Sequence, residues 1–209
     1  MKLHLQKNIY PGKIIVFTGI DGSGKTTLIN KAEKYLLSKN KDCMRVRMPS
    51  DRIRQLTAFR NFHDSKDEKV RNSVDLFSLT VLVSGDRLMT LHEEVIPALK
   101  EGKCVLCDRY CFTGNVRCSD EIITRISERF INPDLTILAT ADVETLKKRV
   151  LSRENEKDLF YDDEGVKKQY NEYLSLAKDN GFQIIDTTKN QDEIDCSLYS
   201  KLDFVFENI

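Results

Sequence analysis

Apolar, β-rich runs alternate with amphipathic segments along this chain, a pattern typical of a parallel sheet wrapped by helices. The runs that we expect to be strands lie at residues 13–18, 42–47, 103–107, 135–139 and 183–186. Between and after them we expect a helix that ends near residue 38, then helices at 72–99, 119–130, 143–152, 165–180 and 191–207. We therefore predict an α/β protein in which a five-stranded parallel sheet carries helices on both faces.

Three segments depart from this simple alternation of strands and helices. Residues 53–69 are polar and weakly periodic, and we expect helical turns with a loop there. Residues 154–164 are charged, so we expect a mobile lid at about 150–165. The 72–99 helix has apolar residues at three- and four-residue intervals on more than one face, which fits a homodimer contact or a helix buried inside one chain.

Composition narrows the class of protein. A chain of 209 residues without repeats or a dividing linker predicts a single domain over residues 1–209. Basic and acidic residues number 33 each, so an overall basic surface for nucleic acid is not expected and a small-molecule partner is favoured. No stretch approaches the roughly 18 apolar residues of a membrane span, and we expect a cytoplasmic protein with no membrane partner.

The cysteines offer one pattern with a chemical meaning, the CxxC spacing of Cys104 and Cys107. Both lie in an apolar run that we expect to be a buried strand, where alternate residues point to opposite faces. We therefore favour buried free thiols, which suit a reducing compartment, over a redox or metal site.

A glycine-rich motif follows the first expected strand and precedes the first helix. It matches the phosphate-binding pattern GxxxxGK[ST] of a P-loop, Gly19-Ile20-Asp21-Gly22-Ser23-Gly24-Lys25-Thr26. Glycines let backbone N–H groups wrap a phosphate, and the helix dipole adds positive potential. We expect Lys25 to reach the β- and γ-phosphates of ATP, Thr26 to ligate Mg²⁺, and Thr27 to contact the α-phosphate. The motif predicts the three-layer P-loop NTPase fold.

Asp108-Arg109-Tyr110 comes directly after the strand that we expect to end at residue 107. Ligands of open parallel sheets bind beyond the carboxyl ends of the strands, so these side chains should face the P-loop. Asp108 is a candidate for holding Mg²⁺ or orienting the acceptor, and Arg109 for gripping an acceptor phosphate. A surface ion pair is the alternative.

Arg149 and Arg153 are spaced four apart at the end of a predicted helix, just before the charged segment. Mobile arginines there can neutralise charge that develops during phosphoryl transfer. A solvated basic helix end is the alternative, and the residues alone do not decide on a role for Arg87.

Taken together, these motifs resemble the thymidylate kinase family in order and spacing. The matching segments cover most of the chain: residues 16–27, Leu82-Val-Ser-Gly-Asp86-Arg87 with 94–99, 105–110, 133–137, Arg149-x3-Arg153 and 184–186. The resemblance implies a nucleoside monophosphate kinase that transfers the γ-phosphate of Mg-ATP to dTMP or a relative. By the same resemblance Asp21 lies near the acceptor sugar or phosphate, Arg87 faces the base, and Arg109 with Arg47 binds the acceptor phosphate.

The sequence departs from the family pattern in the acceptor pocket. Residues 48–52 replace the usual Glu-Pro-Gly-Gly-Thr run. Val83 stands where an aromatic stacks on thymine, and Arg117-Cys118 stands in place of a Tyr-Gln pair. Beyond Arg153 an expected arginine is missing, and Lys157 is the nearest cation.

These departures leave two alternatives open besides a nucleoside monophosphate kinase. One is a kinase of a nucleoside or a non-nucleotide metabolite on the same fold, which the changed base pocket motivates. The other is an inactive nucleotide-binding regulator, which the changed acceptor loop motivates.

Overall fold

The computed structural model describes residues 1–152 and 163–207. A sheet lies at its centre, made of β1 (Lys13–Thr18), β2 (Cys43–Arg47), β3 (Cys104–Asp108), β4 (Leu135–Thr140) and β5 (Gln183–Asp186). The strand order is β2-β3-β1-β4-β5 and every neighbouring pair is parallel. The predicted five-stranded parallel sheet is therefore confirmed.

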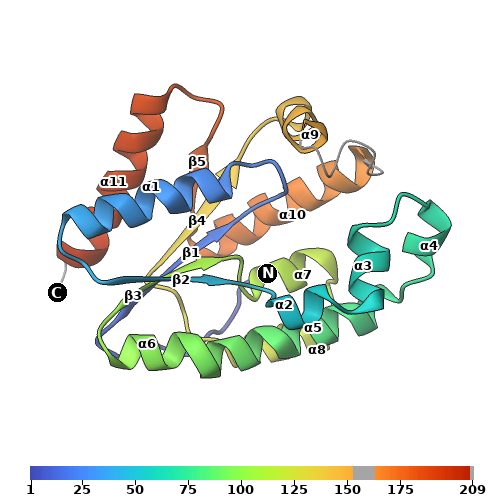
Figure 1. Cartoon of the computed structure of the whole chain (residues 1–209), viewed down its shortest axis with the longest axis horizontal. Coiled ribbons are helices and arrows are strands. Elements are labelled where there is room, and N and C mark those ends of the chain that lie inside the picture. The colour runs from blue at the N-terminus through green and yellow to red at the C-terminus, as the bar shows by residue number, and fades with distance from the viewer. Residues whose placement is uncertain (153–162, 208–209) are drawn as a thin grey trace.

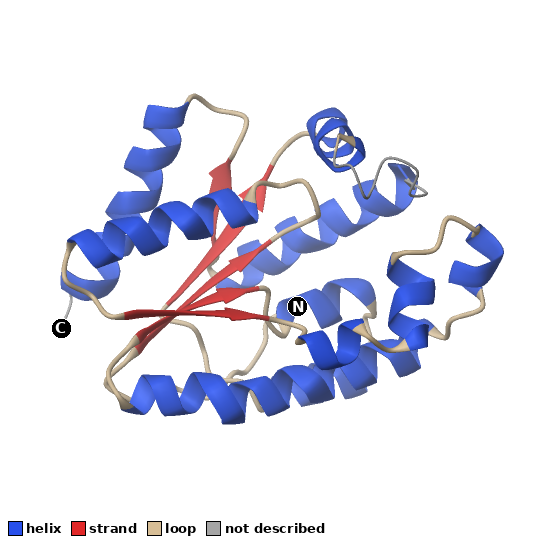
Figure 2. Cartoon of the chain, in the orientation of Figure 1, coloured by secondary structure: helices blue, strands red, loops and turns tan. Residues whose placement is uncertain are grey.

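Helices cover both faces of this sheet (Figures 1 and 2). Ile15 and Phe17 of β1 pack into a cluster with α1 (Lys25–Ser38) and α11 (Gln191–Glu207). Ile14 and Val16 point the other way, into a cluster with residues of a helical layer made of η1 (Leu91–Val95), α6 (Ile96–Lys100), α7 (Phe112–Arg117) and α10 (Asp163–Asn180). Burial of each side chain of this size stabilises the fold by about 1.5–3 kcal/mol. Because the strands carry apolar side chains on both faces of the sheet, they hold the three layers together.

A smaller cluster joins the remaining segment to the body of the protein. The chain after β2 forms three short helices, α2 (Asp51–Arg54), α3 (Thr57–His63) and α4 (Glu68–Asn72). They correspond to the helical turns predicted over residues 53–69. Ile53 and Phe59 pack there against Leu79 and Val83 of α5 (Leu76–Thr90). This contact places α2 and α3 as a wall beyond the end of β2 (Figure 1).

The long helix predicted over 72–99 differs in two respects. It begins only at Leu76, because the Asp75 side chain accepts a hydrogen bond from the Ser78 N–H at 2.8 Å and caps it. A π-helical turn, η1, then separates α5 from α6. Pro97 has no N–H to donate and its ring crowds the preceding turn, so the wider turn accommodates it.

Two short helices were placed less well by the sequence pattern. The helix expected over 119–130 is α8 (Glu121–Ser127), and α7 was not predicted at all. Gly114 in the middle of α7 disfavours a helix by propensity. The helix packs closely on α5 and α8, since a Cβ at Gly114 would lie 3.4 Å from Ser84 Oγ and 3.4 Å from Ile123 Cγ2. Tertiary packing therefore decides this element.

Beyond α9 (Val143–Leu151), most of the lid predicted at 150–165 falls on residues 153–162, outside the described residues. Cys104 and Cys107 are both buried but lie in the clusters on opposite faces of the sheet. The CxxC pair therefore does not converge on one site. Within the part of the chain that the structure describes, no helix is long and apolar enough to cross a membrane.

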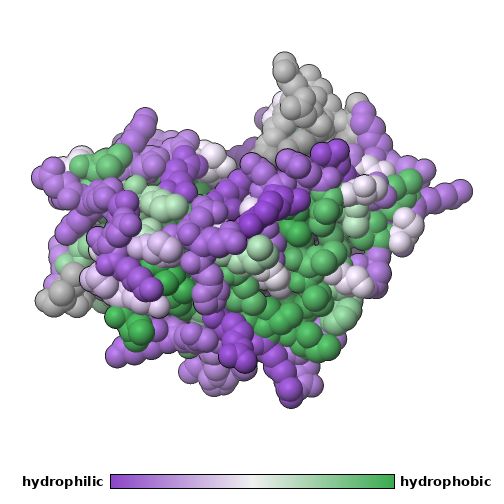
Figure 3. Space-filling view, turned by 60° about the horizontal axis from the view of Figure 1, so that its bottom comes forward, coloured by the Kyte–Doolittle hydropathy of each residue, from purple (hydrophilic) through white to green (hydrophobic). Residues whose placement is uncertain are grey.

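One outer surface carries exposed apolar side chains. In Figure 3, which brings the α5–α6 side forward, hydrophobic residues gather on the right-hand half, where α5 runs. Leu82 and Met89 of α5 are 50% and 49% exposed. The α5 helix thus has apolar residues on its solvent side as well as its core side, which the sequence pattern predicts.

Two glycines give a matched test of the packing. A Cβ at Gly12 would lie 2.5 Å from Lys103 O and 2.7 Å from Leu99 Cα, both backbone atoms. We expect Gly12→Ala to lower the free energy of unfolding by about 1–3 kcal/mol, because the backbone must shift. Gly85→Ala is the control. A Cβ there would have no atom within 4 Å apart from its own stretch of helix, and alanine at an exposed helix position should raise stability by up to about 1 kcal/mol. Urea unfolding curves of both variants measure this, and shifts of the same sign would contradict the described packing.

Candidate functional site

The predicted phosphate loop connects β1 to α1, as its sequence context requires. Gly19, Gly22 and Gly24 have φ angles of 135°, 84° and 85°, which other residues rarely adopt. Gly22 also lies close to α9, since a Cβ there would be 2.7 Å from Leu146 O. The loop ends at the N-terminus of α1, whose free N–H groups and dipole favour an anion.

Lys25 is buried and turns back over this loop. Its Nζ donates hydrogen bonds to the carbonyl oxygens of Gly19 at 3.0 Å and Ile20 at 2.7 Å. Asp21 Oδ1 lies 3.9 Å from the same nitrogen. The ammonium group is therefore held within reach of any anion that enters the loop.

Asp108 and Arg109 lie beside the loop because β1 and β3 pair in register, with Phe17 opposite Asp108. The Arg109 N–H donates to Phe17 O at 2.9 Å, and its φ of 68° bends the chain so that the side chain crosses the loop. Its guanidinium donates to Gly19 O at 3.2 Å and forms an ion pair with Asp21. That ion pair holds the pKa of the Asp21 carboxyl well below its usual range.

A further arginine of the site comes from α5 and is buried. Arg87 is only 3% exposed, and its Nε has no hydrogen-bond partner among the described residues. Burial, with Arg109 and Arg117 nearby, lowers the pKa of Arg87 to about 10, so the side chain stays charged at neutral pH. The preceding residue, Asp86, anchors the altered loop after β2 by accepting from Ser50 N at 2.7 Å and Ser50 Oγ at 2.5 Å.

Arg149 of α9 lies on the other side of the loop. Its guanidinium donates to Gly22 O at 3.3 Å, Thr187 Oγ1 at 2.8 Å and Thr187 O at 3.0 Å. It therefore ties α9 to the phosphate loop and to the segment after β5. Arg153, its predicted partner, lies outside the described residues.

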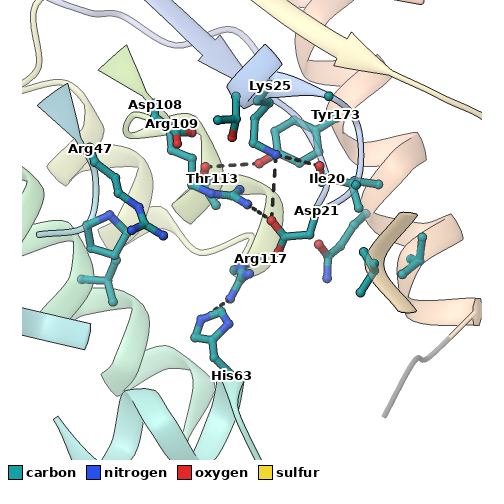
Figure 4. A pocket seen from close by; sticks show the side chains of 18 of the residues that line it. Ile20, Asp21, Lys25, Arg47, His63, Asp108, Arg109, Thr113, Arg117 and Tyr173 are labelled. Atoms are coloured by element: carbon teal, nitrogen blue, oxygen red, sulfur yellow. Dashed lines mark hydrogen bonds and ion pairs between the residues drawn. The ribbon is translucent and has the colours of Figure 1, made fainter. Parts of the chain in front are cut away.

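These side chains line one cavity of about 920 Å³ (Figure 4). The predicted site residues along its wall are Asp21, Gly22, Gly24, Lys25, Thr26, Thr27, Arg47, Arg87, Asp108, Arg109 and Arg149. Gly19 and Ser23 belong to the loop but are not among the residues that line the cavity. The structure thus brings the phosphate loop and the arginines of β2, β3 and α5 to one place.

Several residues of this cavity were not among the predicted site residues. Arg54, Phe59, Phe62 and His63 come from α2 and α3, Tyr173 from α10, and Thr187 from the turn after β5. Thr187 could have been found, because it follows the carboxyl end of a strand. The α2–α3 residues carry no such signal, since only the packing of that segment brings them to the cavity.

Arg117 and His63 meet at the far side of the cavity, below Asp21 in Figure 4. Arg117 Nη1 lies 2.9 Å from His63 Nε2, and the guanidinium lies 5.6 Å from the centre of the Phe62 ring. Burial lowers the pKa of His63 to about 2, and the Arg117 charge adds to that effect. His63 is therefore neutral in the folded protein.

The cavity has donors for anions and oxygen ligands for a cation. The charges of Arg109 and Arg117 help to lower the pKa of Arg87, and the charge of Arg109 helps to lower the pKa of Arg117, whereas the Asp21 carboxylate raises the pKa of Arg109 and acts to raise that of Arg117. Thr26 and Asp108 line the cavity, and Asp108 Oδ1 has no hydrogen-bond partner within residues 1–152 and 163–207. A hydroxyl and a carboxylate are oxygen ligands of the kind that Mg²⁺ binds, so these residues fit such an ion.

The chain is similar to proteins of one family. Residues 17–197 match the family described as thymidylate kinase. A probable thymidylate kinase of Methanocaldococcus jannaschii is 35% identical over 184 residues, covering 86% of this chain and 89% of that protein. Thymidylate kinase of Prochlorococcus marinus is 29% identical, with 94% of this chain and 99% of that protein covered. Probable thymidylate kinase 1 of Saccharolobus solfataricus is 30% identical, with coverages of 87% and 92%.

The neutral state of His63 predicts a pH dependence of stability. The pKa of His63 is about 2 in the folded protein, and its ordinary value is 6.5. Below pH 6.5 the unfolded chain therefore binds a proton that the folded protein does not bind. The free energy of unfolding thus decreases as the pH falls below 6.5. Since His63 keeps some solvent contact, we expect a loss of about 1 kcal/mol between about pH 6.5 and pH 5.

The measurement is urea unfolding of the wild type and of His63→Gln at both pH values. The variant, which cannot take up this proton, should lose about 1 kcal/mol less than the wild type. Equal losses would mean that His63 is protonated in the folded state.

Proposed function

The chain belongs to the thymidylate kinase family and is a nucleotide kinase, and from this premise we propose that it transfers the γ-phosphate of Mg-ATP to dTMP or a related nucleoside monophosphate. The observation that carries the proposal is the shared cavity. The phosphate loop with Lys25 lines it together with Arg87 and Arg109. Two phosphorylated molecules can therefore meet there with their phosphates adjacent.

The donor half of the cavity uses the loop itself. In the proposal, Gly19, Gly22, Ser23 and Gly24 provide the backbone that wraps the ATP phosphates, and Thr27 contacts the α-phosphate. Lys25 exchanges its carbonyl partners, Gly19 O and Ile20 O, for β- and γ-phosphate oxygens.

A metal ion is part of the proposal. Thr26 and Asp108 would hold Mg²⁺, and the unpaired Oδ1 of Asp108 supports that role. When bound, the ion neutralises charge on the transferring phosphate.

The acceptor half uses the arginines. Arg109 and the exposed Arg47 bind the acceptor phosphate, while Asp21 orients the sugar or phosphate and holds the Arg109 guanidinium by its ion pair. Arg87 faces the base. Arg149, and Arg153 from the segment outside the described residues, are proposed to neutralise charge during transfer; the Thr187 contacts of Arg149 support a site on the ATP side.

We also propose that the protein works in the cytoplasm as a homodimer. The exposed apolar residues of α5, Leu82 and Met89, support a partner on that side. Light scattering checks the dimer, and a monomer mass at micromolar concentration would contradict it.

Release of ADP from Mg-ATP against a panel of nucleoside monophosphates tests the function. We expect turnover of dTMP, and Lys25→Ala should lower kcat at least about 100-fold, because a donor to the transferring phosphate is lost. Lys34→Ala, an exposed lysine on the same α1 helix, should leave kcat unchanged.

The other outcomes separate the alternatives. Turnover of a nucleoside or a non-nucleotide metabolite, with silence on every monophosphate, would point to a kinase with another acceptor. Binding of ATP without turnover of any acceptor would point to a nucleotide-binding regulator. Either result would overturn the proposal.

A further inference from the structure

Two cysteines face each other across neighbouring strands, and neither lines the phosphate-binding cavity. Cys43 begins β2 and Cys104 begins β3, and the parallel register places them directly opposite each other. Cys104 belongs to the core cluster on the α1–α11 side of the sheet, and Cys43 packs against the same cluster. The two side chains therefore lie on one face of the sheet, whereas Cys104 and Cys107 lie on opposite faces.

The spacing of this pair is close to that of a disulfide. Neighbouring strands lie about 4.7–4.9 Å apart, which falls within the range of about 4.4–6.8 Å between the Cα atoms of bonded cysteines. The Cβ atoms of a disulfide lie about 3.8 Å apart, so the strands have to draw together by about 1 Å. Because β2 is an edge strand beside β3 (Figure 1) and Cys43 is its first residue, the start of β2 can make that movement.

The two thiols differ in access to solvent and in acidity. Cys43 is partly exposed, whereas Cys104 is only 3% exposed. A hydrogen bond from the Cys104 thiol lowers the pKa of Cys43, against the opposing effects of burial and of the Glu33 and Asp42 charges. The same contact, together with burial, raises the pKa of Cys104. Cys43 is therefore the thiol that meets solvent and loses its proton first, while Cys104 keeps its proton beside it.

We propose that Cys43 is a site of oxidation by hydroperoxides and that Cys104 converts the oxidised sulfur into a disulfide, which links β2 to β3. This modification does not depend on the proposed function. In a reducing compartment the bond is transient, as in redox-sensing proteins. It protects Cys43 from oxidation beyond the sulfenic acid, which is hard to reverse.

The reaction proceeds in two steps. The Cys43 thiolate attacks one oxygen of hydrogen peroxide, so that an S–O bond forms, the O–O bond breaks and hydroxide leaves. The Cys104 sulfur then attacks the sulfur of the Cys43 sulfenic acid. The S–S bond forms, the S–O bond breaks, and the departing hydroxide takes the Cys104 proton to give water. Two thiols are thus oxidised by two electrons, and the peroxide is reduced to two molecules of water.

Oxidation of the folded wild-type protein with an equimolar amount of hydrogen peroxide tests the proposal. Catalase then removes the remaining peroxide, and the thiols that are still reduced are alkylated in denaturant before digestion. Peptide mass spectrometry should find Cys43 joined to Cys104 and the other cysteines chiefly alkylated, and dithiothreitol should release the pair. Absence of this linked peptide, or a mixture of pairings without preference for it, would overturn the proposal.

Two variants separate the steps. In Cys104→Ser the second thiol is missing, so Cys43 should accumulate as a sulfenic acid that dimedone traps, and excess peroxide should convert it to the sulfinic acid. In Cys43→Ser the buried Cys104 should stay reduced, because peroxide does not reach it. Oxidation of Cys104 in that variant at the wild-type rate would contradict the assigned order. A cooperative urea unfolding transition shows that each variant is folded.

Cys196→Ser is the matched control. Cys196 is an exposed free cysteine of α11, and its replacement should leave the yield of the Cys43–Cys104 peptide unchanged. A lower yield would mean that Cys196 takes part in forming the bond, and the direct transfer between the two strands would be wrong.

The same oxidation in concentrated urea shows whether the fold directs the pairing. The six cysteines of the unfolded chain can pair in many ways, and short loops close more easily than the long loop between Cys43 and Cys104. We expect the share of the Cys43–Cys104 peptide to be at least about tenfold lower than in the folded protein. An equal share in both conditions would mean that the strand register does not bring the two thiols together.

Discussion

The register between β1 and β3 is the constraint on which the site depends. Phe17 stands opposite Asp108, so both strands end at the same level of the sheet edge. The N–H of Arg109 continues the pairing by donating to Phe17 O, although the residue itself has turned to a positive φ. That turn costs about 1–2 kcal/mol for a residue with a side chain, and the buried strands on either side supply the stability that offsets it. Its result is a guanidinium that crosses the phosphate loop and reaches Asp21.

The cavity gathers positive charge at the expense of stability. Arg87 is almost completely buried and Arg117 partly so, and burial lowers the pKa of each. Buried cations with few anionic partners destabilise a folded protein, because the lost hydration is not replaced. A phosphorylated acceptor would bring the missing negative charge, so binding should remove part of that cost. Asp21 is therefore important even when no ligand is bound, because its ion pair with Arg109 supplies a negative charge to the cavity.

The sequence predicted those parts of the fold and site that depend on local pattern. The apolar strands, the glycine-rich loop with Lys25, and Asp108-Arg109 at a strand end all follow from short-range rules, and the structure brings them together. What the sequence did not predict depends on contacts between distant segments. The α7 helix contains Gly114, a poor helix former, and packs closely on α5. His63 and Phe62 enter the cavity only through the packing of α2 and α3 on that helix. The roles assigned to the site residues stay predictions, and Arg153 with most of the lid lies outside the described residues.

The two halves of the cavity are therefore built on different principles. The donor half relies on backbone N–H groups, glycine conformations and one helix N-terminus, which bind any nucleotide phosphate alike. The acceptor half relies on side chains that reach across from α3, α5 and α7, and their positions depend on how those helices pack. In the proposed function, a substitution in the first half should disturb the binding of every nucleotide, whereas a substitution in the second should disturb the acceptor alone. Arg117 of α7 and His63 of α3 meet there at 2.9 Å, so the shape of the acceptor half depends on how these two helices pack and not on the phosphate loop.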